Sequence, residues 1–351
     1  MSKKIFIFLS EAIVALLLFS NCGKQKANNS RELLGAGATF PYPLYSKMFS
    51  EYYTEKGIKV NYQAIGSGGG IRQLLNKVVD FGGTDAFLSK EDLEKSKNSI
   101  LHIPTCLGAV VISYNLPDNP QLKLTSEVLV DIYLGKIKKW SNEKIRKLNP
   151  DIKLPDKKIT VIHRSDGSGT TFIFSDYLCK VSSEWKSKIG KGKSLNWPIG
   201  LGGKGNPGVA GLIKQIPYSI GYVELIYAIQ NNMAYALIKN KKGAFIKPSL
   251  KSVSAAAQVN IPDDTRVSLT DTDASNGYPI SSFTWIIFYK EQHYNNRSYE
   301  RAQRTVNLLW WMIHEGQKYN EKLKYSKLPD KAVKKAEKIL KSVTYDGKPI
   351  L

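Results

Sequence analysis

The sequence predicts an α/β protein that is large enough to form two lobes. Short apolar segments typical of strands alternate with longer segments whose apolar residues recur every three or four positions, as in helices. The chain has 351 residues, of which 42% are hydrophobic, so it can bury a large core and form more than one lobe.

The predicted elements follow one another in α/β order. Strand-like segments are expected at 58–62, 107–114, 158–163 and 283–289. Helices are expected at 71–79, through Phe174, Tyr177, Leu178 and Val181, and at 299–319 and 329–343. Internal repeats are not evident, so the alternation itself is the main indication of the fold.

The first residues are typical of an export signal. Two lysines precede an apolar run that ends close to Asn21 and Cys22, and a polar stretch follows. We predict a lipoprotein signal peptide at 1–21, a lipid on Cys22 and a flexible tether at 22–33. The protein would then be exported to the cell envelope or periplasm and anchored to a membrane. Because Asn21 stands where Gly, Ala or Ser is usual, ordinary signal cleavage nearby is the alternative. No later apolar run is long enough to span a bilayer.

The chain is strongly basic, with 51 Lys and Arg against 30 Asp and Glu and a formal net charge of +21. Loss of 1–21 removes two lysines and one glutamate, which leaves +20. Such a field raises the encounter rate with anions and favours contact with acidic lipid headgroups. Nucleic-acid binding is the alternative, but the lysines are dispersed and no nucleic-acid module is recognisable, so we expect no nucleic-acid partner.

The histidines and cysteines predict no metal site. The four histidines lack the spacing of metal ligands. Cys106 and Cys179 match no disulfide framework, so we expect free buried thiols, with a disulfide as the alternative.

Three glycine-rich segments carry the chemistry of an oxyanion site. In 163–172, Arg164 offers a planar fork of donors, Ser168 and Thr170 offer hydroxyls, and Gly169 lets backbone N–H groups approach an anion. Two other segments, 35–41 and 66–70, place Thr39 and Ser67 just before predicted helices. Three such helix starts imply one shared anion, although Thr39 and Ser67 taken singly could be ordinary N-caps.

Four further segments, 81–86, 131–140, 197–206 and 220–224, complete a pattern that resembles the phosphate-binding proteins of bacterial phosphate ABC transporters. The resemblance extends from about Leu34 to the C-terminus. It implies a two-lobed periplasmic-binding-protein fold of type II, with the ligand in the cleft between the lobes and two crossover hinges, near Pro104 and Pro279. Lobe I would comprise 34–104 plus 279–351, and lobe II would comprise 105–278.

The resemblance also implies which residues bind phosphate. Asp166 would orient Arg164, and Asp85 would select the ligand, because a protonated phosphate can donate an O–H to a carboxylate whereas sulfate has only acceptors. Asp85 could instead cap the helix near Ser89 or pair with Arg164. His163 stands where the family often has arginine and is not expected to be a ligand. The expected phosphate ligands are Thr39, Phe40 through its backbone N–H, Ser67, Asp85, Arg164, Ser168, Gly169 and Thr170.

The function implied by the resemblance is that of a monomeric, non-enzymatic receptor without a cofactor. It would capture inorganic phosphate and deliver it to an ABC transporter permease driven by separate ATPase subunits. The alternative is a phosphatase or other serine hydrolase built on Ser168 or Ser67, for which His163 is the sole histidine near a motif. An added role as a phosphate sensor also stays open. The loop 200–208, which holds Lys204, is not a Walker A loop; it would lie near the cleft or contact the permease.

Overall fold

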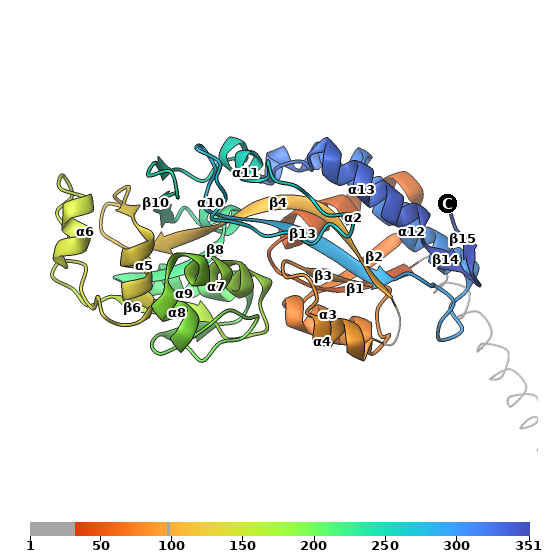
Figure 1. The fold of residues 1–351 in the computed structure, drawn as a ribbon, viewed down its shortest axis with the longest axis horizontal. Coiled ribbons are helices and arrows are strands. Elements are labelled where there is room, and N and C mark those ends of the chain that lie inside the picture. Colours follow the sequence, from red (N-terminus) through yellow and green to blue (C-terminus); the bar gives the residue numbers. More distant parts are fainter. Residues whose placement is uncertain (1–31, 97–98) are drawn as a thin grey trace, which may run out of the picture.

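The computed structural model describes residues 32–96 and 99–351 and shows two α/β lobes side by side (Figure 1). Two long strands, β4 (Ile100–Tyr114) and β13 (Ile280–Tyr289), run from one lobe into the other. Within the described residues they belong to a ten-stranded sheet with the order β2-β1-β3-β13-β4-β8-β6-β7, to which β12 and β9 are attached. The predicted two-lobed fold with two crossovers is confirmed.

The first lobe is built on the parallel strands β1 (Glu32–Gly37), β2 (Lys59–Ala64) and β3 (Phe81–Thr84). One face of the sheet is covered by α2 (Tyr42–Lys56), α12 (Tyr299–Ile313) and α13 (Asp330–Lys341). On the other face packs α3 (Ser67–Leu75), and α4 (Lys90–Lys95) lies on the same side of the sheet. The C-terminal helices pack through apolar residues at helical spacing, as α13 does with Ala332, Ala336 and Leu340. Smaller elements are η2 (Glu315–Tyr319), η3 (Glu321–Leu323), β14 (Thr344–Tyr345) and β15 (Lys348–Pro349).

The second lobe is built on β6 (Thr160–Arg164), which pairs in parallel with β7 (Leu201–Gly203) and β8 (Ser219–Glu224). Strands β6 and β7 each lead to a helix that begins within five residues: α7 (Gly169–Val181) follows β6, and α9 (Gly205–Gln215) follows β7. The remaining elements are β5 (Lys123–Leu124), α5 (Ser126–Tyr133), α6 (Glu143–Leu148), α8 (Ser183–Lys188), α10 (Leu225–Gln230), β9 (Ala234–Tyr235), β10 (Leu237–Lys239), β11 (Phe245–Ile246), α11 (Leu250–Ala256) and β12 (Leu269–Thr270).

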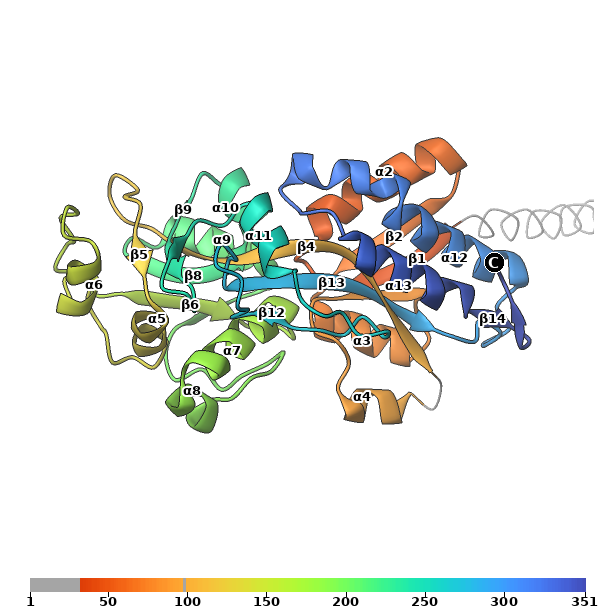
Figure 2. The ribbon, with the colours of Figure 1, turned by 45° about the horizontal axis from the view of Figure 1, so that its top comes forward.

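The two crossing strands run between the lobes (Figure 2), and β4 changes its partner along the way. β4 pairs with β13 through residues 100–109 and with β8 through residues 110–114. The register of β4 and β13 shifts at Thr284 and Trp285, which face Cys106 and Pro104, so that Thr105 is an extra residue. Bulges of this kind bend a strand and increase its twist. The bulge lies next to Pro104, one of the predicted hinges; the numerical lobe boundaries stay a prediction.

The predicted strands are all present, but several boundaries were wrong. The helix expected at 71–79 is α3, which begins at Ser67 and ends at Leu75, because Lys77 adopts a left-handed φ of 56°. The helix expected at 299–319 ends at Ile313 and continues as the 3-10 helix η2.

The predicted tether was also too long, since Glu32 and Leu33 lie in β1 and Leu33 is fully buried. The signal peptide and Cys22 lie outside the described residues. Among the residues that the structure describes, no helix combines the length and the apolar character needed to cross a membrane. Cys106 and Cys179 are unpaired, as predicted, although Cys179 is only half-buried.

Candidate functional site

The second lobe contributes a strand end and a helix start. Arg164 is the last residue of β6 and is 4% exposed, and α7 begins five residues later at Gly169. Ser168 caps this helix: its Oγ accepts a hydrogen bond of 3.0 Å from the backbone N–H of Thr171. The first N–H groups of a helix, here those of Gly169 and Thr170, have no partner within the helix and carry its positive dipole end. This end of α7 is therefore suited to an anion.

Asp166 holds the guanidinium of Arg164. Arg164 donates from Nε to Asp166 Oδ1 over 2.7 Å and from Nη2 to Oδ2 over 2.6 Å, while its Nη1 lies 3.3 Å from Thr170 Oγ1. Asp166 also accepts from the backbone N–H of Gly205 at 3.0 Å. Burial tends to raise the pKa of Asp166, but the bonds and charge of Arg164 and the Gly205 N–H bring it below its usual value. Asp166 is thus ionised and fixes the direction of the arginine.

The first lobe contributes Ser67 and Asp85. Ser67 is the first residue of α3 and is not its N-cap, which is Gly66. The Oγ of Ser67 accepts from the backbone N–H of Asp85 at 3.2 Å and lies 3.5 Å from its Oδ2. Thr284 on β13 donates to Asp85 Oδ1 over 2.8 Å. Of the two structural alternatives for Asp85, capping is ruled out because Ser89 caps α4. In the described part of the chain, the ion pair of Arg164 is with Asp166 rather than with Asp85.

Burial raises the pKa of Asp85 to about 7, although the Thr284 hydroxyl, the charge of Arg164 and the Ser67 hydroxyl act in the opposite direction. The carboxyl group therefore exchanges its proton near neutral pH. Its ionised form accepts a hydrogen bond from a ligand that carries a proton, and its protonated form can donate a hydrogen bond.

Thr39 and Phe40 lie at the boundary between the lobes. Thr39 is not a helix cap, since Pro41 is the N-cap of α2. Its Oγ1 accepts two bonds from Asn206, one from the backbone N–H at 3.1 Å and one from Nδ2 at 3.0 Å. Phe40 is fully buried, and its carbonyl accepts from the hydroxyl of Tyr325 at 2.6 Å. Both residues are thus held in place by partners distant in sequence.

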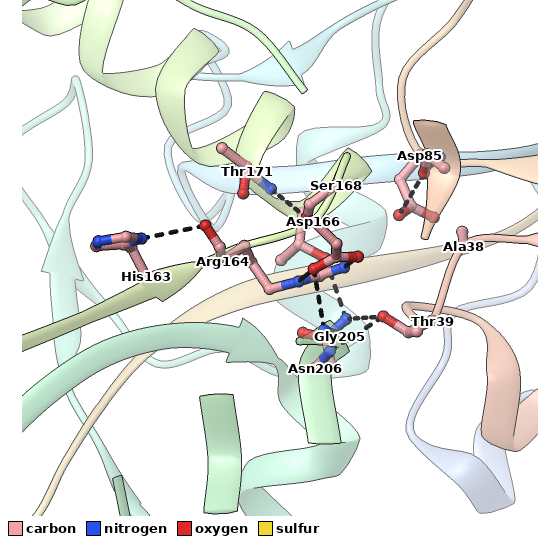
Figure 3. A network of polar contacts seen from close by, with 12 residues as sticks. Ala38, Thr39, Asp85, His163, Arg164, Asp166, Ser168, Thr171, Gly205 and Asn206 are labelled. Atoms are coloured by element: carbon pink, nitrogen blue, oxygen red, sulfur yellow. Dashed lines mark hydrogen bonds and ion pairs between the residues drawn. The ribbon is translucent and has the colours of Figure 1, made fainter. Parts of the chain in front are cut away.

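The two halves of the site face each other at short range. Figure 3 shows Asp85 and Thr39 approaching from one side and Arg164 and Ser168 from the other. The backbone N–H of Gly68 on α3 donates to the carbonyl of Gly167 over 2.8 Å. A Cβ atom added to Gly169 would lie 2.5 Å from both Asp85 Oδ2 and Ser67 Oγ. The structure therefore has the lobes closed on the site and brings all eight predicted ligand residues to one region.

Sequence reasoning missed three buried polar residues around the site. Thr284 bonds Asp85, and Asn206 bonds Thr39 and, through Nδ2, Thr170 Oγ1 at 3.1 Å. Glu224 is fully buried beside them, and its backbone N–H donates to Asn206 Oδ1 over 3.0 Å. Asn206 stands in the glycine-rich segment 200–208, which places part of that loop at the site, although Lys204 itself is exposed. The glycine-rich pattern was the available signal for Asn206; Thr284 had none.

His163 is placed by packing. Its ring stacks on Trp197 with centroids 5.0 Å apart and an interplanar angle of 13°, and its Nδ1 lies 3.1 Å from the carbonyl of Arg164. That His163 is not a ligand stays a prediction.

The protein has two lobes joined by two long strands, and a buried arginine, helix N-termini and hydroxyls lie between the lobes. These features define a solute-binding protein of the periplasmic type with an oxyanion site. Known proteins agree with this class. A family model described as a PBP superfamily domain matches residues 23–305. The phosphate-binding protein PstS of Pasteurella multocida is 43% identical over 331 residues, which cover 93% of this chain and 94% of that protein. The phosphate-binding protein PstS of Xylella fastidiosa is 44% identical over 316 residues, covering 88% and 84%.

A solved structure of a high-affinity periplasmic phosphate-binding protein with bound phosphate has a TM-score of 0.71 at 19% identity and covers 88% of this chain and 93% of its own. At this identity it supports the fold alone. With the sequence relatives, the conclusion is plain: the chain belongs to the PBP superfamily and, within it, to the phosphate-binding protein PstS family.

Proposed function

We propose that this protein captures inorganic phosphate between its lobes and delivers it to the permease of an ABC transporter for import. The observation that carries the proposal is the meeting of Arg164 and the start of α7 with a buried carboxyl group, Asp85, whose pKa is about 7. A cation and free N–H groups bind an anion, while a carboxyl group that exchanges protons near neutral pH suits an anion that still carries one. Phosphate has this property near pH 7.

Each half of the site has a role in this proposal. In the second lobe, Arg164 binds two phosphate oxygens, and Ser168, Gly169 and Thr170 donate from hydroxyl and backbone groups at the start of α7. In the first lobe, Thr39, Phe40 and Ser67 donate from hydroxyls and backbone N–H groups, and Asp85 shares the phosphate proton. A micromolar or tighter affinity, about −8 kcal/mol or more favourable, would come from these charge-assisted bonds in a dry site.

The proposal is that of a receptor and not of an enzyme. The relatives are named for binding phosphate. The hydroxyl of Ser168 accepts from a backbone N–H and that of Ser67 from the backbone N–H of Asp85, whereas His163 is stacked on Trp197. Within the described residues no group of His, Cys, Asp and Glu could hold a metal ion. A hydrolase would need a base positioned on its nucleophile or a metal-bound water.

The proposal includes a route to the membrane. Lipid attached to Cys22 would keep the receptor at the membrane that holds the permease, with the ATPase on separate chains, and the mature receptor would act as a monomer.

Equilibrium dialysis with radiolabelled phosphate, run beside a hydrolysis assay with p-nitrophenyl phosphate, tests the proposal. We expect one phosphate per chain and no release of nitrophenol. Turnover of the ester, or failure to retain phosphate at micromolar concentrations, would refute it.

A further inference from the structure

Among the residues that the structure describes, Asn206 is the one whose side chain bonds both Thr39 and Thr170. It is the second residue of α9 and is fully buried. Its Nδ2 donates to Thr39 Oγ1 over 3.0 Å and to Thr170 Oγ1 over 3.1 Å, and its backbone N–H donates to Thr39 Oγ1 over 3.1 Å. Thr39 precedes α2 in the first lobe and Thr170 lies on α7 in the second, so Asn206 bridges the lobes.

The orientation of the Asn206 amide is fixed by a neighbour. The backbone N–H of Glu224 lies 3.0 Å from Asn206 Oδ1. Because a backbone N–H can only donate, the amide oxygen must face it. The amide NH₂ group is therefore turned toward the two threonines, with one N–H for each.

This orientation decides where the threonine protons point. A hydroxyl has two acceptor positions and one proton to donate. Both acceptor positions of Thr39 are filled by Asn206, and those of Thr170 are filled by Asn206 and by Arg164 Nη1 at 3.3 Å. Each proton is left for a further acceptor, and an anion in the site is such an acceptor.

We propose that Asn206 is a positioning residue that fixes both threonine hydroxyls as proton donors to the bound anion and ties the closed lobes together. The inference rests on the proposed function, with phosphate as the anion. Asn206 itself does not touch the phosphate in this scheme. Because its bonds to Thr39 join the two lobes, they form only when the lobes are closed, so Asn206 links closure to the alignment of the donors.

A thermodynamic cycle tests this role. Phosphate affinity is measured by calorimetry for the wild type, Asn206→Ala, Thr39→Val/Thr170→Val, and the triple variant. With the threonines intact, Asn206→Ala should weaken binding on the order of 10- to 100-fold, the factor for one or two bonds to a charged group. In the valine background, where no hydroxyl is left to orient, the same change should weaken binding by less than about 3-fold.

Asn149→Ala is the matched control. Asn149 is a buried asparagine of the second lobe with three bonds, to the backbone N–H and carbonyl of Lys123 and to the carbonyl of Ile145. Its loss should lower the melting temperature and leave phosphate affinity unchanged.

If Asn206→Ala fails to fold, Asn206→Asp replaces it in the same cycle. The aspartate is isosteric and keeps the bond from Glu224, but it accepts the threonine protons instead of donating. Its added charge repels the anion in both backgrounds, so the difference between backgrounds isolates the hydroxyls. Equal factors in the two backgrounds would overturn the inference. If the wild type did not bind phosphate at all, the proposed function would fail and the inference with it.

Discussion

Arg164 is the fixed cation of the proposed phosphate site, so its removal is the most informative single change. Its side chain is 1% exposed and makes three polar contacts, two with Asp166 and one with Thr170. Arg164→Ala removes the attraction for the anion and leaves Asp166, whose side chain is 14% exposed, as an unpaired negative charge beside the site. Both changes act against binding.

The expected loss follows from the burial of this pair. Truncating one member of a buried, hydrogen-bonded charge pair costs about 2–5 kcal/mol, which corresponds to a phosphate affinity weaker by about 30- to 4,000-fold. Arg164→Lys keeps the charge but cannot make the two parallel bonds to Asp166 and also reach Thr170, so it should be intermediate. Arg164→Ala/Asp166→Asn should recover part of the loss, since it removes the unpaired charge.

Calorimetric titration with phosphate measures these affinities. Arg266→Ala is the matched control, because Arg266 also pairs with an aspartate two positions away, donating from Nε and Nη2 to Asp264 Oδ2, but this pair is partly exposed. The control should bind phosphate like the wild type. Native-like affinity in Arg164→Ala, or an equal loss in Arg266→Ala, would show that Arg164 is not the anion's main cation.

Three further predictions concern selectivity, closure and anchoring. Asp85 has a pKa of about 7, so its protonated fraction, which can donate a hydrogen bond to sulfate, grows as the pH falls. Sulfate affinity, measured by competition assays, should therefore be about 30-fold higher at pH 5 than at pH 8.5. The variant Asp85→Asn should bind sulfate equally at both pH values. Gly169→Ala would place a Cβ 2.5 Å from Asp85 Oδ2 and Ser67 Oγ, so phosphate affinity should fall by about 5- to 150-fold by calorimetry. Its control, Gly211→Ala, meets nothing within 4 Å and should bind normally; equal affinities would mean that closure is not needed. Cys22→Ser should release the exported protein from membranes in detergent partitioning, and mass spectrometry that finds lipid elsewhere would contradict this prediction.

The architecture could be predicted because local patterns determine it. Alternating strand and helix segments predicted the α/β class, and glycine-rich turns at helix starts located Ser67 and Ser168. The ends of elements were less predictable, since they depend on single backbone conformations such as the positive φ of Lys77.

The partners of the site residues could not be read from the sequence. Thr284 lies 199 positions from Asp85 and reaches it only because β13 pairs with β3. Asn206 reaches Thr39 across 167 positions when the lobes close. A threonine in a strand and an asparagine in a glycine-rich loop are common, so neither residue indicates from the sequence which residue it will bond.

The central claim is that one phosphate is held between the lobes and that Asp85 accepts a hydrogen bond from the proton that phosphate carries. Calorimetric titration of the mature protein at pH 8.5, where Asp85 is mostly ionised, tests this claim most directly, with phosphate and sulfate injected in separate runs. We expect phosphate to bind with one site per chain and micromolar or tighter affinity, and sulfate to give no measurable binding. Equal affinity for the two anions, or a stoichiometry other than one, would contradict the account.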